Sequence, residues 1–285
     1  MLIVNRNEPL GRLGNQLELA THLILFSILS NQRVNIPFDN KWKKSFPYLS
    51  ENILNCFPRI ACRWRSADRM ARFAVKAIMR AGMVREIDLR TSQEWIYFDS
   101  TCSSPDHGEV LRRLSNSRLC AASLWSFRAA SITDGHADAV RSALRPMPDV
   151  LDFGMRFRQS INADIVVGLH VRLGDFRSVF PDRIYSFQHY QDRLREIEDC
   201  FPGRHVGFII CSDEDVEQEF RDFIWAFPKG NPVQDIFALA QCDYIVGAPS
   251  TFSRWAAFWG NKKLCLLASK TQRIASLDEF KAASF

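Results

Sequence analysis

The sequence predicts an α/β protein whose second half forms a parallel, doubly wound sheet. Its 285 residues are enough for two compact domains or one large one. From about residue 163 onward, short apolar runs alternate with helical patterns, and this repeated strand–helix order implies parallel strands. The run from Ala163 to Leu169 is rich in β-branched residues and apolar on both faces, which is typical of a buried parallel strand.

The first half of the chain is less regular. Its first elements are expected to be a strand, a loop, a helix and a second strand, over residues 2–4, 11–16, 17–30 and 33–37. Residues 40–149 lack a clear alternation of strands and helices, although 67–82 has a helical pattern. The basic stretch 59–80 is explained by a solvated helix face, with an acceptor-binding or membrane-surface patch as the alternative.

A proline-containing segment at 145–148 predicts a domain boundary, with an N-terminal domain over 1–149 and a C-terminal domain over 150–285. Beyond this segment, strands are expected at residues 165–171, 205–211, 244–247 and 264–267. Helices are expected over 188–199, 214–225, 232–241 and 252–260, with a final helix from about Ser276. No Gly-x-Gly-x-x-Gly follows these strands, so an NAD-type dinucleotide site is disfavoured.

Four chemically useful residues lie at or just after the end of the strand at 165–171: His170, Arg172, Gly174 and Asp175. Ligands of open α/β sheets bind at the carboxyl ends of the strands. Arg172 offers a planar, permanently charged fork that suits phosphate, and Gly174 allows a sharp turn or a close approach to a ligand. The alternative is a turn in which Arg172 and Asp175 merely pair with each other.

Hydroxyl groups gather where a helix is expected to follow the strand at 244–247. Ser250, Thr251 and Ser253 lie at this helix start, together with Phe252. A helix N-terminus with free N–H groups and adjacent hydroxyls suits a phosphate. The alternative is ordinary N-capping, but a cap needs only one such residue, and here three occur within four positions.

Composition indicates a globular enzyme. A net charge of +5 suits a phosphate-bearing ligand or a nearby anionic surface, and it is too small to indicate nucleic-acid binding. No stretch approaches the roughly 20 apolar residues that a transmembrane helix needs. The eight cysteines include no Cys-x-x-Cys pair, which favours reduced, buried thiols over disulfides or a zinc site.

Four motifs together resemble the fucosyltransferase superfamily, most closely the bacterial α-1,2-fucosyltransferases of glycosyltransferase family 11. In chain order they are Gly11-Arg12-Leu13-Gly14-Asn15-Gln16, His170-x-Arg172-x-Gly174-Asp175, Cys211-Ser212-Asp213-Glu214, and Asp235 followed by Ser250-Thr251-Phe252-Ser253-x-Trp255-Ala256-Ala257. The protein O-fucosyltransferases share the first two. The resemblance implies a GT-B-type fold, in which two Rossmann-like lobes face a cleft. Residues 1–149 would form the acceptor side and 150–285 the GDP-sugar-binding lobe.

The resemblance also implies a reaction. It is the inverting transfer of L-fucose from GDP-β-L-fucose to a hydroxyl of an oligosaccharide, polysaccharide or glycolipid-linked acceptor, with an α-1,2 linkage. Leu173 departs from the second Arg that many α-1,2 and α-1,6 enzymes carry, and Arg254 replaces an aromatic residue. Two alternatives stay open: a GDP-sugar-binding protein without transferase activity, and a transferase that uses another nucleotide sugar. Golgi relatives carry an N-terminal membrane anchor, and this sequence shows no stretch of that kind. We therefore expect a cytoplasmic protein, and a peripheral contact with the inner membrane face stays open.

The resemblance assigns roles to individual residues. Arg172 would neutralise the β-phosphate, and His170 and Asp235 would recognise guanine. Asn15 would lie in a first-lobe loop opposite the donor. Apart from the resemblance, a general base must be a carboxylate or histidine within hydrogen-bond reach of the acceptor hydroxyl, and Asp175 is the nearest candidate by sequence, with orientation of Arg172 as its other role. Other candidates for the base are Glu8 and Asp39. The expected donor-binding set is Gly14, Asn15, His170, Arg172, Gly174, Ser212, Asp213, Asp235, Ser250, Thr251, Phe252 and Ser253. Because Arg172 and the groups of 250–253 supply the phosphate contacts, we expect neither a metal nor a further cofactor.

Overall fold

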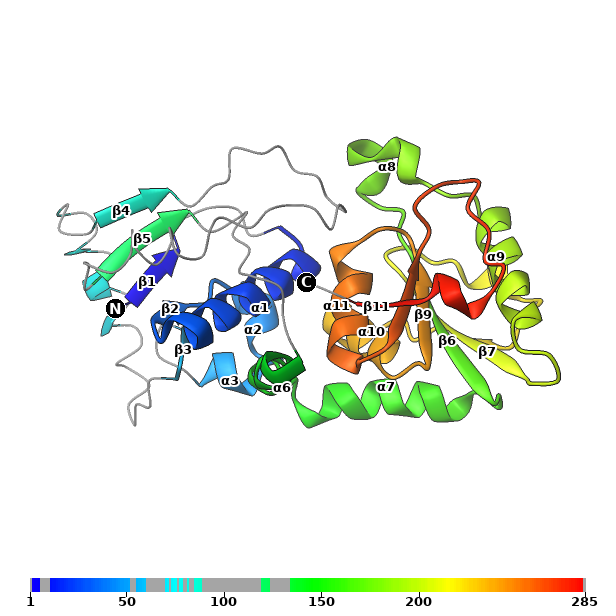
Figure 1. The fold of residues 1–285 in the computed structure, drawn as a ribbon, viewed down its shortest axis with the longest axis horizontal. Helices are drawn as coiled ribbons and strands as arrows, with labels where there is room; N and C mark the ends of the chain where they lie inside the picture. Colours follow the sequence, from blue (N-terminus) through cyan, green and yellow to red (C-terminus); the bar gives the residue numbers. More distant parts are fainter. Residues whose placement is uncertain are drawn as a thin grey trace. The chain divides into compact units, whose positions relative to one another are not determined.

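The structure is a computed structural model that describes residues 2–5, 11–51, 55–59, 85–88, 119–123 and 134–283, with a few positions between 70 and 81. The chain divides into two compact units, Met1–Pro146 with Phe285, and Met147–Ser284. Each unit contains its own mostly parallel sheet (Figure 1). The division falls within the proline-containing segment 145–148.

The first unit has a five-stranded sheet among its described residues, in the order β3-β2-β1-β5-β4. Its strands are β1 (Leu2–Asn5), β2 (Arg33–Asn35), β3 (Cys56–Phe57), β4 (Arg85–Asp88) and β5 (Leu119–Ser123). All neighbouring strands are parallel except β2 and β3. Helices in the described part are α1 (Leu13–Ser30), α2 (Asn40–Lys43), α3 (Pro47–Ser50) and α6 (Asp134–Ala143).

Helix α1 begins four residues before the predicted helix, so the predicted loop over 11–16 is wrong from Leu13 onward. Leu13 and Leu17 are both buried, at 2% and 0% exposure. Their i,i+4 spacing therefore extends the buried helix face upstream of residue 17. Arg12 is the N-cap, and Gly11 has a φ of 62°, a left-handed conformation that glycine adopts at little cost.

The second unit has a six-stranded sheet, in the order β11-β10-β9-β6-β7-β8. Its strands are β6 (Ile165–Val171), β7 (Val206–Ser212), β8 (Trp225–Ala226), β9 (Tyr244–Gly247), β10 (Lys263–Leu266) and β11 (Lys281–Ala282). Its helices are α7 (Pro148–Ser160), α8 (Phe176–Val179), α9 (Phe187–Asp199), α10 (Pro232–Ala240) and α11 (Thr251–Gly260). The four predicted strands and the helices α9, α10 and α11 are confirmed to within a residue.

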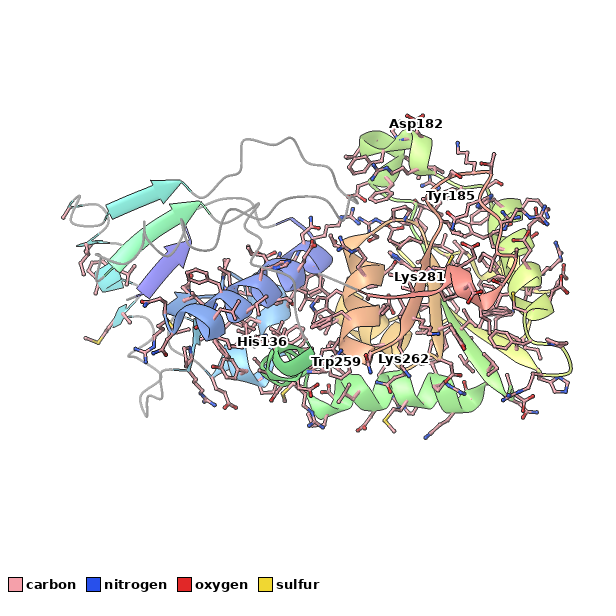
Figure 2. The ribbon with its side chains drawn as sticks, viewed as in Figure 1. His136, Asp182, Tyr185, Trp259, Lys262 and Lys281 are labelled. Carbon is pink, nitrogen blue, oxygen red and sulfur yellow. The ribbon has the colours of Figure 1, made fainter. Side chains whose placement is uncertain are left out.

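The central strand β6 separates two packed layers of this unit. Val167 and Val171 point to one face and share a core cluster with Tyr190 of α9. Gly168 points to the other face, where a Cβ would meet Leu239 of α10 at 2.9 Å. Side chains fill the space on both faces of the sheet (Figure 2). Because β6 is covered on both faces, its carboxyl end is the part of the strand left accessible to a ligand.

The helix predicted over 214–225 is wrong. The structure has a short 3₁₀ turn, η3 (Glu217–Phe220), followed by β8. Ser212 Oγ accepts the Glu214 N–H at 3.2 Å, and Asp215 Oδ1 accepts the Glu217 N–H at 3.2 Å. These side chains offer the backbone a local alternative to helical hydrogen bonds, so the apolar periodicity of the segment does not produce a helix.

The final helix predicted from Ser276 is also wrong. Ser276 caps a 3₁₀ turn, η4 (Leu277–Glu279), and the chain then forms β11, which pairs antiparallel with β10. Phe280 is buried at 3% exposure and joins the core cluster on the α9 face. Burial of this side chain holds the segment against the edge of the sheet, so the sheet is mixed and not wholly parallel.

Helix α7 was not expected from the sequence, although local signals mark it. Pro148 occupies the first turn and Asp149 supplies a negative charge there, as is typical of a helix N-terminus. Val150 and Gly154 are the buried positions of the helix and are four residues apart. A Cβ on Gly154 would lie 3.0 Å from the Cα of Ala238, so this glycine lets α7 pack closely on α10.

Two further observations concern the described residues of both units. Among the described helices, none combines the length and the apolar character needed to cross a membrane. The cysteines whose side chains are described are free thiols, namely Cys56, Cys200, Cys211, Cys242 and Cys265. For these five, the predicted reduced state is confirmed.

Candidate functional site

The motifs of the second unit meet at the carboxyl ends of β6, β7 and β9. In the sheet register, His170 lies beside Cys211 of β7 and beside Gly247 of β9. The segments that follow these three strands therefore leave the same edge of the sheet. This brings together residues 170–175, 212–214 and 250–253, which are far apart in the sequence.

Arg172 is held by two carboxylates at this edge. Its Nη2 lies 2.5 Å from Asp175 Oδ1 and its Nη1 lies 3.1 Å from Asp213 Oδ2. The guanidinium carbon also lies 5.1 Å from the centre of the Phe176 ring. The side chain is only 12% exposed. The contact with Asp175 is what both the orienting role and simple pairing within the turn predict. The contact with Asp213 adds a second partner, which pairing within the turn did not include.

Asp213 joins the ends of β6 and β7. Its Oδ1 accepts the Leu173 N–H at 3.0 Å, while Oδ2 contacts Arg172. A Cβ on Gly174 would collide with Asp213 Oδ2. Gly174 therefore leaves space for the Asp213 carboxylate. The sequence predicted that this glycine would allow a ligand to approach closely, whereas the group that approaches it is a side chain of the protein.

His170 is buried and held on two sides. Its Nδ1 lies 2.8 Å from Ser253 Oγ, and its ring stacks on Phe252 with centroids 4.8 Å apart. Burial, with a smaller contribution from the positive charge of Arg172, lowers the pKa of His170 to about 3. His170 is therefore neutral at physiological pH, with one ring nitrogen as a donor and the other as an acceptor.

The hydroxyl groups at the start of α11 are used differently from one another. Ser250 is the N-cap and accepts the Phe252 N–H at 3.1 Å. Ser253 is fully buried and bonds to His170, so the prediction that it lines a phosphate cradle is wrong. The capping alternative holds for Ser250, while Thr251 lies half-buried in the first turn.

Asp235 lies in the first turn of α10 and is 9% exposed, so it is a buried carboxylate and not an exposed charge at a helix N-terminus. Its Oδ1 accepts the Gly230 N–H at 3.1 Å. Burial raises the pKa of Asp235 to about 7, against the opposing effect of the Gly230 hydrogen bond. Asn231 and Gln234 already form a capping box at this helix end, so capping of α10 does not depend on the Asp235 carboxylate.

In the first unit, the predicted site residues lie at the start of α1. Gly14 and Asn15 are in its first turn, so neither residue lies in the predicted loop. Gln16 Nε2 donates to Gly11 O and to Asp39 Oδ2, both at 2.9 Å, and Gln16 Oε1 accepts the Asp39 N–H. Asp39 is thus tied to Gln16. Glu8, the other candidate base, lies outside the described residues.

Residues 137–285, more than half of the chain, match the glycosyl transferase family 11. The chain belongs to this family. The match covers the second unit and every site residue described at the ends of β6, β7 and β9. The predicted membership of glycosyltransferase family 11 is therefore confirmed.

Curated relatives of this family 11 chain match it over a shorter stretch. Galactoside 2-alpha-L-fucosyltransferase SEC1 of Bos taurus is 31% identical over 115 residues, which cover 37% of this chain and 31% of the relative. Galactoside alpha-(1,2)-fucosyltransferase 1 of Saimiri sciureus has the same identity and coverage. The matched stretch thus spans about a third of the length of these relatives.

Solved structures resemble the family 11 chain over most of its length. POFUT1 in complex with GDP-fucose superposes with a TM-score of 0.59 and 12% identity, covering 92% of this chain and 95% of that chain. The fucosyltransferase NodZ from Bradyrhizobium has a TM-score of 0.52 and 14% identity, covering 95% and 96%. At such identities the likeness concerns the fold, and it confirms the predicted α/β fold of the GT-B type.

The expectation of a metal-free phosphate site left out a paired-carboxylate pattern, Asp213-Glu214-Asp215. In the structure of this family 11 protein, the two aspartates have separate partners. Asp213 contacts Arg172 and Leu173, whereas Asp215 accepts from Lys229 Nζ at 3.2 Å and from the Glu217 N–H. The Lys229 contact and the Glu217 hydrogen bond lower the pKa of Asp215. These partners hold the two carboxylates in protein contacts that a metal would have to replace.

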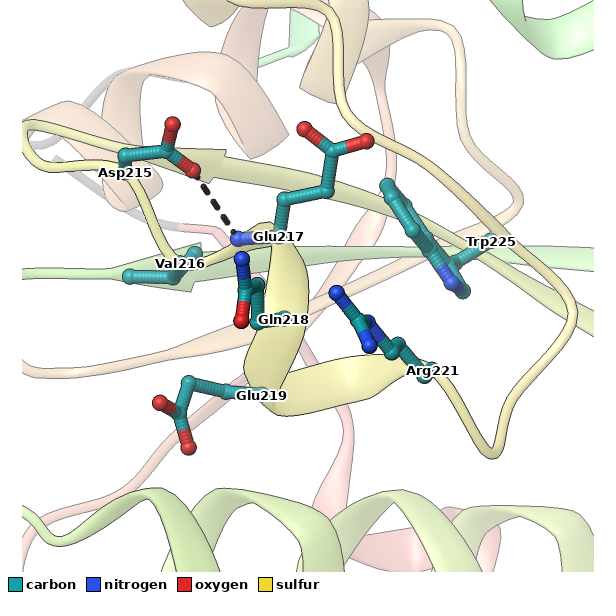
Figure 3. A pocket seen from close by; sticks show the side chains of 7 residues that line it. All are labelled: Asp215, Val216, Glu217, Gln218, Glu219, Arg221 and Trp225. Atoms are coloured by element: carbon teal, nitrogen blue, oxygen red, sulfur yellow. Dashed lines mark hydrogen bonds between the residues drawn. The ribbon is translucent and has the colours of Figure 1, made fainter.

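Two features near this segment were not expected from the sequence. Arg177 forms a two-pronged ion pair with Glu214, which ties α8 to the segment after β7. Beyond it, the residues around η3 line a hollow of about 490 Å³, and Figure 3 shows the side chains that line it, among them Glu217, Arg221 and Trp225. The ion pair joins residues 37 positions apart, so no local pattern reveals it.

Proposed function

We propose that this family 11 protein transfers L-fucose from GDP-β-L-fucose to a hydroxyl group of an oligosaccharide, with inversion at the fucose carbon. The observation that carries the proposal is the arrangement at the ends of β6 and β7, where two carboxylates hold Arg172 beside the neutral, buried His170. The relatives named above are galactoside fucosyltransferases, and POFUT1 was solved with GDP-fucose. An α-1,2 linkage to a galactoside is the form that these names support.

Arg172 is the proposed electrophilic group. As the bond between fucose and the β-phosphate breaks, negative charge builds on the departing GDP. A guanidinium already held beside the phosphates stabilises this charge with little reorganisation. Asp175 and Asp213 hold Arg172 at this edge of the sheet. Position 173 is a buried leucine and not a second arginine, so this motif brings one guanidinium to the sheet edge.

Asp235 and His170 are the proposed recognition groups for guanine. An ionised carboxylate accepts from both the ring N–H and the exocyclic amine of guanine, and uracil has no equivalent pair of donors. Gly230 supports this role, because a Cβ at this position would lie 2.7 Å from Asp235 Oδ1. The hydrogen bond from the Gly230 N–H fixes the carboxylate in one orientation.

We expect GDP to stabilise the protein against heat more than UDP does at pH 8, where Asp235 is mostly ionised. At about 100 times its Kd, a ligand adds about 2.7 kcal/mol to the free energy of unfolding. Asp235→Asn should remove the difference between the nucleotides, since an amide cannot accept both guanine N–H groups as a carboxylate does. Asp222→Asn, at an exposed carboxylate, is the matched control.

The measurement is a thermal-shift titration with GDP, UDP and ADP, followed by mass spectrometry of a β-galactoside incubated with GDP-fucose. Equal shifts with GDP and UDP would refute the guanine assignment. Binding of GDP-fucose with no fucosylated product from any acceptor would favour the alternative of a sugar-nucleotide-binding protein.

We further propose that transfer requires no metal ion. Arg172 supplies the positive charge at the phosphates, and Asp213 and Asp215 are engaged by Arg172 and Lys229. Product formation should therefore continue at an unchanged rate in EDTA, and Asp215→Asn should leave kcat within about twofold, the effect expected for an exposed ion pair. A rate that is lost in EDTA and restored by Mn²⁺ would show that transfer depends on a metal ion and would overturn this proposal.

A further inference from the structure

A buried tyrosine hydroxyl lies behind the turn that carries Arg172. Tyr190 is in α9 and has 0% exposure. Among the described residues, no group meets full hydrogen-bond geometry with its hydroxyl, and the backbone of Arg172 is the group that approaches its oxygen. The O–H donor therefore has no acceptor in the described part of the chain, and a buried donor without an acceptor is costly because it has given up its hydrogen bond to water.

The surroundings of Tyr190 place this hydroxyl next to the proposed site. Tyr190 shares one core cluster with Val171 and Leu173, the residues on either side of Arg172. Leu173, in the same cluster, donates its N–H to Asp213, so the packing around Tyr190 reaches the carboxylate that holds the guanidinium. In agreement with this, burial raises the pKa of Tyr190, a hydrogen bond from the backbone of Arg172 opposes that rise, and the Asp213 carboxylate adds to it.

Tyr185 provides a contrast within the same cluster. Its ring lies edge-on to Tyr190 with centroids 5.8 Å apart, and it is 3% exposed. The Tyr185 hydroxyl donates to the backbone carbonyl of Leu267, so it has the partner that buried polar groups usually have. Figure 2 labels Tyr185 in the second unit. A phenylalanine at 190 would fill the same space as Tyr190 without the buried hydroxyl, whereas a phenylalanine at 185 would leave the Leu267 carbonyl without this donor.

We propose that Tyr190 is a positioning residue, whose hydroxyl donates to the Asp213 carboxylate when the Arg172 guanidinium turns toward the β-phosphate of GDP-fucose. The proposal rests on the proposed function. When Arg172 turns, Asp213 loses the guanidinium that lies 3.1 Å from its Oδ2. Because the Asp213 side chain is only 20% exposed, water replaces this partner poorly. A neutral O–H donor at this point keeps the carboxylate hydrogen-bonded, so Arg172 can move to the phosphate at a lower cost.

The test compares Tyr190→Phe with Tyr185→Phe in the full chain. We expect Tyr190→Phe to lower kcat for fucosyl transfer by about tenfold, as for loss of one hydrogen bond to a charged group. The KM for GDP-fucose should change by less than about threefold, because the charge on the β-phosphate is greatest in the transition state. The melting temperature without nucleotide should be unchanged or higher. Tyr185→Phe should do the opposite, lowering the melting temperature and leaving kcat unchanged.

Two results would overturn the inference. If Tyr190→Phe lowers the melting temperature and keeps normal kcat, the hydroxyl has a structural partner, such as a bridging water. The same conclusion follows if kcat is normal in Tyr190→Phe while Arg172→Ala is inactive, and the proposed function then stands without this role. A wild-type protein that binds neither GDP nor GDP-fucose would overturn both proposals together.

Discussion

Arg172→Ala and Arg172→Lys are both expected to lower kcat for fucosyl transfer by at least about 100-fold, the range for loss of one preorganised donor. Charge on the β-phosphate grows as the glycosidic bond breaks, so Arg172 stabilises the transition state more than the bound donor. GDP affinity should therefore fall less than kcat. Lysine keeps the charge but cannot contact two carboxylates through a planar fork.

The structure supplies controls for this prediction. Arg177→Lys changes an arginine in the same region that is 54% exposed and paired with Glu214, and it should leave kcat within about twofold. Arg172→Ala also leaves Asp213 without the guanidinium, which lowers stability. Adding Asp213→Asn removes that charge while keeping an acceptor for the Leu173 N–H. The double variant should recover the melting temperature but not kcat.

Steady-state kinetics and melting curves of these variants test whether Arg172 stabilises the transition state or only forms ion pairs. Near-normal turnover in Arg172→Ala would show that Arg172 is an ordinary ion-pair residue at a strand end. Recovery of activity in the double variant would show that the loss came from an unpaired carboxylate and not from the missing cation.

Asp235→Asn and His170→Asn are expected to change the pH dependence of stability in opposite directions. The pKa of Asp235 is about 7 in the folded protein and 3.8 when unperturbed. The folded state therefore binds more protons between these values, and the stability contributed by Asp235 is complete below pH 3.8 and lost as the pH rises through 7. The pKa of His170 is about 3 against 6.5. Its contribution is complete above pH 6.5 and lost as the pH falls through 3.

The two contributions largely cancel in the wild-type protein between pH 4 and 6.5, because each is worth about 1.4 kcal/mol per pH unit with opposite sign. The stability of Asp235→Asn relative to wild type should rise with pH at roughly this slope. The stability of His170→Asn relative to wild type should fall at the same slope. The constant loss from breaking the His170–Ser253 hydrogen bond shifts the second curve without changing its slope.

Urea unfolding of the full chain at pH 4.5, 5.5 and 6.5 measures both slopes. Exposed Asp222→Asn is the control and should run parallel to wild type. Parallel curves for all variants would mean that His170 and Asp235 are solvated in the folded protein. The assignment of both residues to a buried recognition site would then lose its support.

The strands of the second unit were predictable because their signal is local. A strand such as β6 is covered on both faces, so its sequence is a short apolar run that differs from the amphipathic helices around it. Repeated strand–helix order then fixes parallel pairing. It follows that His170, Ser212 and Ser250, each at or just past a strand end, lie along one edge of the sheet. Motif positions in the sequence were therefore enough to predict that these segments meet at one edge of the sheet.

Segments 214–225 and 276–283 were mispredicted because partners outside the local apolar pattern decided them. Side chains of Ser212 and Asp215 take backbone N–H groups that a helix would need, and burial of Phe280 lays the last strand on β10. Neither effect changes the apolar periodicity on which the helix predictions relied. Periodicity reports which face of a segment can be buried, and it does not report which hydrogen bonds compete for its backbone.

The sequence by itself determined the fold class, the edge of the sheet at which the motifs meet, and most of the residues gathered there. Only the tertiary structure decided what each side chain does: Asp213 holds Arg172, Ser253 holds His170, and Asp235 is buried next to Gly230. Strand and helix formation depends mainly on neighbours a few positions away, which the sequence shows directly. The partners of Arg172 and His170 lie as far as 83 positions away. Their contacts, and the pKa values that follow from burial, exist only once the sheet has brought those segments together.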